Sequence, residues 1–242
     1  MRTRAVLAQT RAEVLLQARR GENALVTLAI PLGVLVFFAK VDAIDTGFDA
    51  SVEFLVPGVL ALSVMAAAMV SLGIATGFER RYGVLKRLGS TPLSRSGLLA
   101  AKTATVLMLE TMQFALVGAV GIALGWEPDA GLVPAVGLMA LGTVAFAGIG
   151  LLLAGTLRAE ANLAAANGLF LVLLFLGGMA YPLDRLPAVL EAVARVLPAA
   201  ALSETLRGAL TTEPFPSGAL AVLVAWATLA PLAAGRWFRW EE

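Results

Sequence analysis

The chain has 242 residues, of which 59% are hydrophobic and 14% charged, and its mean hydropathy is +0.86. These values are typical of an integral membrane protein and exclude a soluble globular domain. The sequence contains no cysteine and no histidine. Disulfides, thiolate or imidazole metal sites and histidine-dependent catalysis are therefore excluded. We expect one all-helical membrane domain over residues 1–242, with no catalytic residue and no metal ligand.

The N-terminal segment, residues 1–23, carries five arginines and no apolar core. It therefore does not resemble a cleavable signal peptide. The segment could be a polar tail or a helix lying at the membrane interface, and we favour the interfacial helix. Its arginines would then suit anionic lipid headgroups.

Six apolar runs are long enough to be considered as membrane-spanning helices. They cover residues 24–39, 54–78, 103–124, 132–157, 163–180 and 219–238. Most of the 18 Lys and Arg residues fall in the N-terminus, in 79–102, in 158–162 and in the C-terminus. Because positive charge marks cytoplasmic segments, both termini are predicted to lie in the cytoplasm.

The basic stretch 79–95 separates the second and third runs. A helix from Glu79 to Leu88 would bring Tyr82 close to Leu85, and Gly89, Ser90 and Pro92 would end it. Its four cations would then face phosphate, carboxylate or water; they are Arg80, Arg81, Lys86 and Arg87. On charge alone the stretch also fits an ordinary cytoplasmic loop.

The longest connection on the opposite side is 181–217. Apolar residues recur at helical spacing over 186–197, and Pro198 interrupts them, which predicts one or two short helices dipping at the outer interface. Glu204 and Arg207 are three residues apart in 199–210. An ion pair between them would let that segment lie shallowly in lipid, as a cap over an exit path.

Glu110, followed by Gln113, is the one acid well inside a predicted span. A carboxylate in that place should face protein or water. It could contact the transport path, or form a structural hydrogen bond to a neighbouring helix. Gly73 and Gly77 would permit close packing of helices within the chain.

Two blocks of sequence resemble the type-2 ABC exporter permease family, the membrane subunits of drug, lipid and polysaccharide exporters. The first block contains Phe78, Glu79, Arg80, Arg81, Gly83, Leu85, Arg87, Leu88, the run Pro92-Leu93-Ser94-Arg95, and Lys102. The second contains Asn162, the run Gly177-Gly178-Met179-Ala180-Tyr181-Pro182, and Leu197-Pro198 through Arg207. The resemblance implies six spans with outer re-entrant helices over 181–217.

The resemblance also implies which residues carry the function. The coupling helix that docks on an ATPase would consist of Glu79, Arg80, Arg81, Tyr82, Gly83, Val84, Leu85, Lys86, Arg87 and Leu88. The second and fifth spans would face the transport route, which together with the polar pair of the third span gives the candidates Met65, Met69, Glu110, Gln113, Asn167 and Phe170. The chain has no phosphate-binding G-x-x-x-x-G-K-[ST] loop, so ATP and Mg would bind to separate ATPase subunits.

The sequence thus predicts the permease of an ABC exporter in a prokaryotic inner membrane, paired with a second copy or a paralogue and with no nucleic-acid partner. It would move an amphipathic or hydrophobic substrate, such as a drug, antibiotic or lipid, by alternating access. The alternative is a self-sufficient, ion-coupled carrier or channel, which should show several intramembrane charges or broken repeats. A membrane-embedded enzyme is disfavoured by the missing histidine and cysteine.

Overall fold

The structure is a computed structural model that describes residues 10, 21–41, 51–89, 95–128, 131–179, 181–212 and 214–239. In these ranges every regular element is a helix. The longer elements are α2 (Gly21–Val41), α3 (Ser51–Met65), α4 (Leu72–Arg81), α6 (Arg95–Ala123), α7 (Leu132–Thr156), α8 (Ala159–Leu176), α10 (Pro198–Leu210) and α11 (Ser217–Trp237). The short ones are the π-helix η1 (Ala66–Ser71), α5 (Val84–Gly89), the 3-10 helix η2 (Leu183–Arg185) and α9 (Ala188–Ala194).

Five helices within the described ranges are long and apolar enough to cross a membrane, which makes the chain a multi-pass membrane protein. They are Val52–Arg81, Ala100–Ala123, Leu132–Thr156, Ala159–Leu176 and Ser217–Trp237. The first of the six predicted spans corresponds to α2, whose apolar segment Ala29–Lys40 is shorter than the others. Six spans therefore remain a prediction. The interfacial helix expected over 1–23 falls largely outside the described residues.

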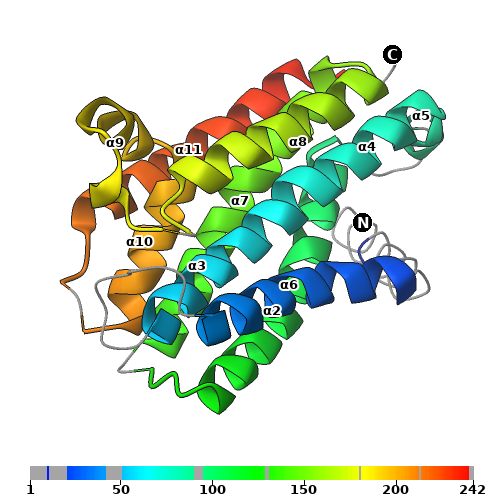
Figure 1. Cartoon of the computed structure of the whole chain (residues 1–242). Helices are drawn as coiled ribbons and strands as arrows, with labels where there is room; N and C mark the ends of the chain where they lie inside the picture. The colour runs from blue at the N-terminus through cyan, green and yellow to red at the C-terminus, as the bar shows by residue number, and fades with distance from the viewer. Residues whose placement is uncertain are drawn as a thin grey trace.

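The continuous helix α3–η1–α4 and helix α7 form the centre of the bundle (Figure 1). Helices α6, α8 and α11 pack around this centre and expose most of their apolar side chains. Such side chains would face water in a soluble protein, but in a membrane they face lipid or another subunit.

Glycines bring the two central helices into backbone contact. A Cβ atom added to Gly150 of α7 would lie 2.5 Å from the carbonyl oxygen of Met69, and one added to Gly73 would lie 2.9 Å from that of Gly150. A side chain at either position would push the helices apart. The close packing predicted at Gly73 is confirmed, and it lies within the chain.

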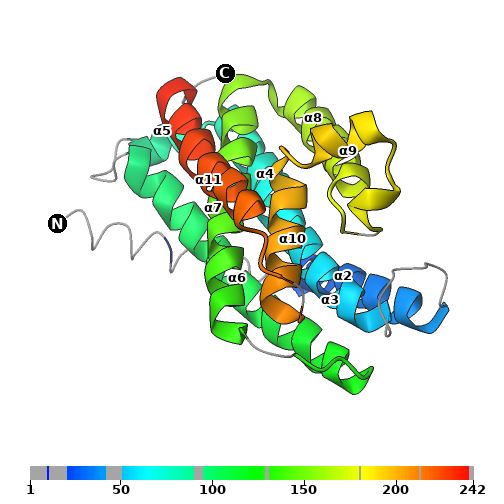
Figure 2. The same ribbon diagram turned by 90° about the vertical axis from the view of Figure 1, so that its left-hand side faces the viewer.

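Figure 1 shows α5 at one end of the bundle and α9 at the opposite end. Turned by 90°, the bundle shows α10 running alongside α7 and α11 rather than over the end of the bundle (Figure 2). The side chains of α10 are mostly buried, including Ala200, Leu202 and Leu206. The expectation that 199–210 lies shallowly in lipid is therefore wrong, because this helix packs between α3, α7 and α11.

Candidate functional site

The segment that joins the second and third spans contains a break that the sequence analysis missed. Helix α4 ends at Arg81, Tyr82 and Gly83 form a turn, and α5 begins at Val84. Gly83 has φ +69°, a left-handed conformation that glycine adopts without steric cost. A single helix from Glu79 to Leu88 is therefore wrong, because Gly83 ends α4 and lets the chain turn into α5.

Backbone hydrogen bonds hold this turn closely to the helix before it. The amide of Tyr82 donates to the Phe78 carbonyl at 2.9 Å, and the amide of Gly83 donates to the Arg80 carbonyl at 3.0 Å. Beyond the turn, the Arg87 amide donates to the Gly83 carbonyl at 3.2 Å. Helix α5 is therefore a short continuation of α4 rather than a free loop.

Helix α5 and the turn present a mixed apolar and basic surface. Tyr82 is 66% exposed, Val84 is 38% exposed, and Lys86 and Arg87 are also exposed. Leu85, in contrast, is 0% exposed. Leu85 is therefore buried inside the protein and does not face a partner. The exposed apolar side chains that could contact a partner are those of Tyr82 and Val84.

Arg80 is buried in the last turn of α4, although its place in the basic segment predicted that it would face phosphate, carboxylate or water. Its exposed fraction is 5%, and its Nη1 and Nη2 atoms each donate a hydrogen bond of 2.6 Å, to the carbonyls of Ala154 and Leu157. These carbonyls lie where α7 ends, and a helix cannot satisfy its last carbonyls itself. The guanidinium also carries positive charge to the negative end of the α7 dipole.

The residues on either side of Arg80 form ion pairs with two other helices. Glu79 Oε2 lies 2.7 Å from the Nζ atom of Lys102 in α6, and Lys102 is 2% exposed. Arg81 pairs with Glu160 in the first turn of α8, and both side chains are substantially exposed. Arg81 therefore faces a carboxylate as expected, but that carboxylate belongs to the same chain.

A further polar contact joins α4 to α8. The Nδ2 atom of Asn162 donates to the Gly73 carbonyl at 2.9 Å. The same side chain occupies the space that a Cβ atom on Gly77 would need. The predicted apolar runs end at 157 and resume at 163, which left 158–162 as a connection between two spans. Only contacts between distant segments show that Glu160 and Asn162 belong to a packed helix.

Glu110 lies in α6 and is 2% exposed. It accepts a hydrogen bond from the hydroxyl of Thr143 in α7, which also lies 2.8 Å from the Met139 carbonyl. The structural hydrogen bond to a neighbouring helix, one of the two interpretations of Glu110, is therefore present. Gln113 is buried one turn further along α6.

The remaining candidates for the transport route do not share one surface. Met65 and Met69 are completely buried in the core. Asn167 is exposed on α8 and donates to the Leu163 carbonyl of its own helix, whereas Phe170 is partly buried and packs against the core. Their role in a route remains a prediction.

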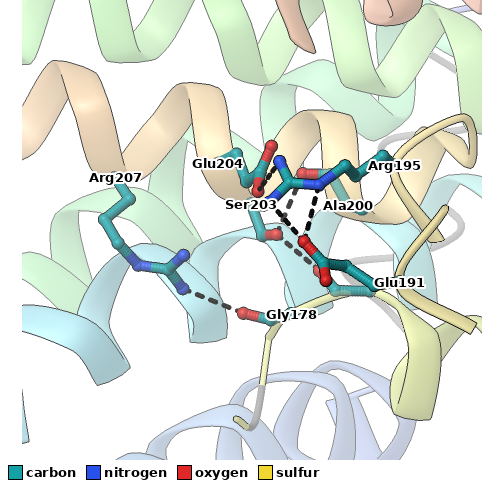
Figure 3. Close-up of polar contacts among 8 residues, drawn as sticks. Gly178, Glu191, Arg195, Ala200, Ser203, Glu204 and Arg207 are labelled. Atoms are coloured by element: carbon teal, nitrogen blue, oxygen red, sulfur yellow. Dashed lines mark hydrogen bonds and ion pairs between the residues drawn. The ribbon is translucent and has the colours of Figure 1, made fainter. Parts of the chain in front are cut away.

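The turn that follows α8 is held by side chains of α10 (Figure 3). The Ser203 hydroxyl donates to the Gly177 carbonyl, and Arg207 Nη2 donates to the Gly178 carbonyl at 2.8 Å. The Arg207 guanidinium lies 3.9 Å from the ring centroid of Phe54, a cation–π contact. Arg207, like Arg80, is a buried arginine bound to backbone oxygen.

Figure 3 also shows Glu204 turned toward Arg195 and away from Arg207. The Nη1 atom of Arg195 lies 3.6 Å from Glu204 Oε1, and its Nη2 atom lies 2.7 Å from Glu191 Oε1. These carboxylates raise the pKa of Arg195, with the hydrogen bond to Glu191 as the largest cause. The expected pairing of Glu204 with Arg207 is thus replaced by one with Arg195.

Acidic residues do not cluster in a way that could hold a metal ion in the described part of the chain, since no group of three or more candidate ligands occurs there.

The sequence of the chain matches a family of known proteins. The model of the ABC-2 type transporter family matches residues 4–211. The chain is 29% identical over 171 residues to the "Probable multidrug ABC transporter permease YbhS" of Escherichia coli strain K12, and equally to the protein of that name from strain O157:H7. The matched segment covers 69% of this chain and 45% of those relatives, so the match spans about half their length.

Proposed function

Because the chain belongs to the ABC-2 type transporter family, we propose that it is the membrane subunit of an ABC exporter driven by separate ATPase subunits. The observation that carries this proposal is the surface of α5. This short helix lies at one end of the bundle and exposes Val84, Lys86 and Arg87, and the turn before it exposes Tyr82, while Leu85 is buried.

The chemistry of this surface suits a protein partner with a shallow apolar pocket and acidic surroundings. Aromatic residues and arginine are enriched at interfaces between proteins. Complementary charge steers partners together and fixes their orientation. We therefore assign α5 as the coupling helix, with Tyr82 and Val84 in direct contact with the ATPase.

ATP and Mg would bind to the ATPase, and this chain would bind no cofactor itself. Nucleotide-driven closure of two ATPase subunits would displace α5 in each of two membrane subunits. The membrane subunits would then alternate between inward-open and outward-open states. The exposed apolar faces of α8 and α11 supply surfaces for a second copy, a paralogue or lipid.

The proposed substrate is an amphipathic or hydrophobic compound. The E. coli relatives are named as multidrug permeases, and the spans of this chain are rich in apolar side chains. The α5 end would lie in the cytoplasm, with both termini, and the α9 end would lie on the outer side of the inner membrane, where η2, α9 and α10 form the outer region.

Co-purification tests the docking surface. The tagged chain is extracted from its native membrane in mild detergent, and the bound proteins and their ATP hydrolysis are measured. Val84→Asp places a charge on the α5 surface and should remove the ATPase. Val189→Asp is the matched control, because Val189 is an exposed valine in α9 at the opposite end, and it should retain the ATPase.

The alternative, an ion-coupled carrier, can be tested with the same preparation. A wild-type chain that yields no ATPase, and that moves an apolar dye across liposomes without nucleotide, would contradict the exporter proposal. In that case Glu110, the acid buried in α6, would be the first residue to test for a role in ion coupling.

A further inference from the structure

Three consecutive residues at the end of α4 contact three different helices. Glu79 pairs with Lys102 of α6, Arg80 binds the end of α7, and Arg81 pairs with Glu160 of α8. Successive side chains of an α-helix point about 100° apart, so three in a row reach partners on different sides. The last turn of α4 is thus a junction between three helices, directly before α5.

The three contacts differ in how firmly they hold. The Arg81–Glu160 pair is exposed to solvent on both sides, and such pairs hold weakly. Arg80 is 5% exposed and uses both terminal nitrogens of its planar guanidinium on two carbonyls. Moving α4 without the turn between α7 and α8 would leave a buried charge, one buried carbonyl and one partly buried carbonyl without these bonds.

Helix α5 is joined to Arg80 by a short, hydrogen-bonded connection. Only Arg81, Tyr82 and Gly83 separate Arg80 from α5, and the Arg80 carbonyl itself accepts the hydrogen bond from the Gly83 amide. A displacement of α5 therefore reaches the backbone of Arg80 through a short, hydrogen-bonded segment. The Arg80 side chain extends that link to the last turn of α7 and to Leu157, in the turn before α8.

We propose that Arg80 is the positioning residue that transmits displacement of α5 to the turn between α7 and α8, and so to α8. This inference rests on the proposed function, since it assumes that an ATPase moves α5. It gives Arg80 a role inside the membrane subunit, whereas the sequence alone placed this residue at the docking surface.

Hydrogen exchange of the complex between the full chain and its co-purified ATPase tests the inference. In the wild type, Mg-ATP should change the exchange of amides 155–162 as well as those of α5. In Arg80→Lys the ATPase should remain bound and α5 should still respond. The response of 155–162 should be lost, because an ammonium group cannot replace the planar fork on two carbonyls.

The matched control is Arg207→Lys, which changes another buried arginine that donates to a backbone carbonyl, at the opposite end of the bundle. It should retain the response of 155–162. If Arg80→Lys fails to fold, two glycines inserted after Gly83 provide a second variant. The insertion leaves the buried contacts in place, but adds slack before α5, so the response should again be lost.

Two outcomes would overturn the inference. One is an unchanged ATP response of 155–162 in Arg80→Lys or in the insertion variant, which would mean that the turn responds by another route. The other is a wild-type complex in which α5 responds and 155–162 does not. Failure of the proposed function is distinguishable from both, because then no ATPase would bind and α5 itself would show no response to Mg-ATP.

Discussion

The two ends of α8 are held in different ways. At the α5 end, the turn before α8 is bound by Arg80, and an exposed ion pair between Arg81 and Glu160 adds to it. At the opposite end, the turn after α8 is bound by Ser203 and Arg207. Both ends use a buried arginine on backbone carbonyls that lie at a helix end or just beyond it.

The difference lies in what surrounds each arginine. Arg207 packs on the ring of Phe54, and the backbone of Met179 in the same turn presses against Gly58 of α3. Arg80 has charged neighbours on both sides, and their ion pairs involve partly exposed carboxylates. We infer that the α9 end is a closed, packed joint, whereas the α5 end is an electrostatic joint that salt and a docking partner can influence.

The largest expected effect comes from breaking the packed joint. Arg207→Ala removes a charged hydrogen bond and a cation–π contact, and should lower the free energy of unfolding by about 3 kcal/mol. Thermal unfolding in detergent measures the loss. Arg195→Ala is the control: its ion pairs are partly exposed, so about 1 kcal/mol or less is expected. Equal losses for the two variants would contradict the packed joint.

Adding a methyl group to α3 tests the same packed contact between α3 and the turn after α8. In Gly58→Ala the new Cβ would collide with the Met179 carbonyl, so α3 and the turn after α8 must separate, at a cost of about 2 kcal/mol. Gly33→Ala in α2 meets no atom within 4 Å and should be neutral or slightly stabilising. Comparing the unfolding temperatures of the two variants gives the result. A stable Gly58→Ala protein would show that the turn has room to move.

Breaking the ion pair between Glu79 and Lys102 of α6 should lower the free energy of unfolding by a smaller amount. Glu79→Gln leaves the buried ammonium group of Lys102 without this carboxylate. We expect a loss of about 1–2 kcal/mol, below the range for fully buried pairs, because Glu79 is 26% exposed. Exchanging the two residues, as Glu79→Lys with Lys102→Glu, should restore part of that stability. If the exchange restored none of the lost stability, the loss in Glu79→Gln would not come from breaking the ion pair.

The smallest change in the free energy of unfolding is expected from breaking the exposed ion pair between Arg81 and Glu160. Arg81→Ala should cost about 1 kcal/mol or less, and the cost should shrink further in high salt. Unfolding at low and high ionic strength measures both. A loss as large as that of Arg207→Ala, independent of salt, would remove the distinction between the two joints.

Five of the six predicted spans correspond to long apolar helices of the described residues, because long apolar runs dominate their hydropathy. The run 132–157 agrees with α7 to within one residue at its end. The spans that begin at Ala100 and Ala159 were placed too late, at 103 and 163. Polar residues near each start, including Lys102 and Glu160, resembled loop residues. Their partners lie on α4, and no local pattern shows such distant contacts.

The sequence indicated where the exposed basic segment lies, but not its geometry. Charge and spacing indicated the basic segment around Lys86 and Arg87, which the structure places on an exposed helix. The same charges could not show that Arg80 points inward, since its acceptors are two backbone carbonyls, and every residue carries one. Likewise, Gly83 gave no sign of its positive φ within an otherwise helical pattern.

The sidedness of the two ends is the measurement that tests the account most directly. The chain has no cysteine, so Lys86→Cys in α5 and Val189→Cys in α9 each supply a single thiol for a membrane-impermeant maleimide. In intact right-side-out vesicles, the thiol at 189 should react, and the thiol at 86 should react only after the membrane is opened. Reaction at 86 in intact vesicles would place α5 outside, away from ATP, and would contradict its role as the coupling helix.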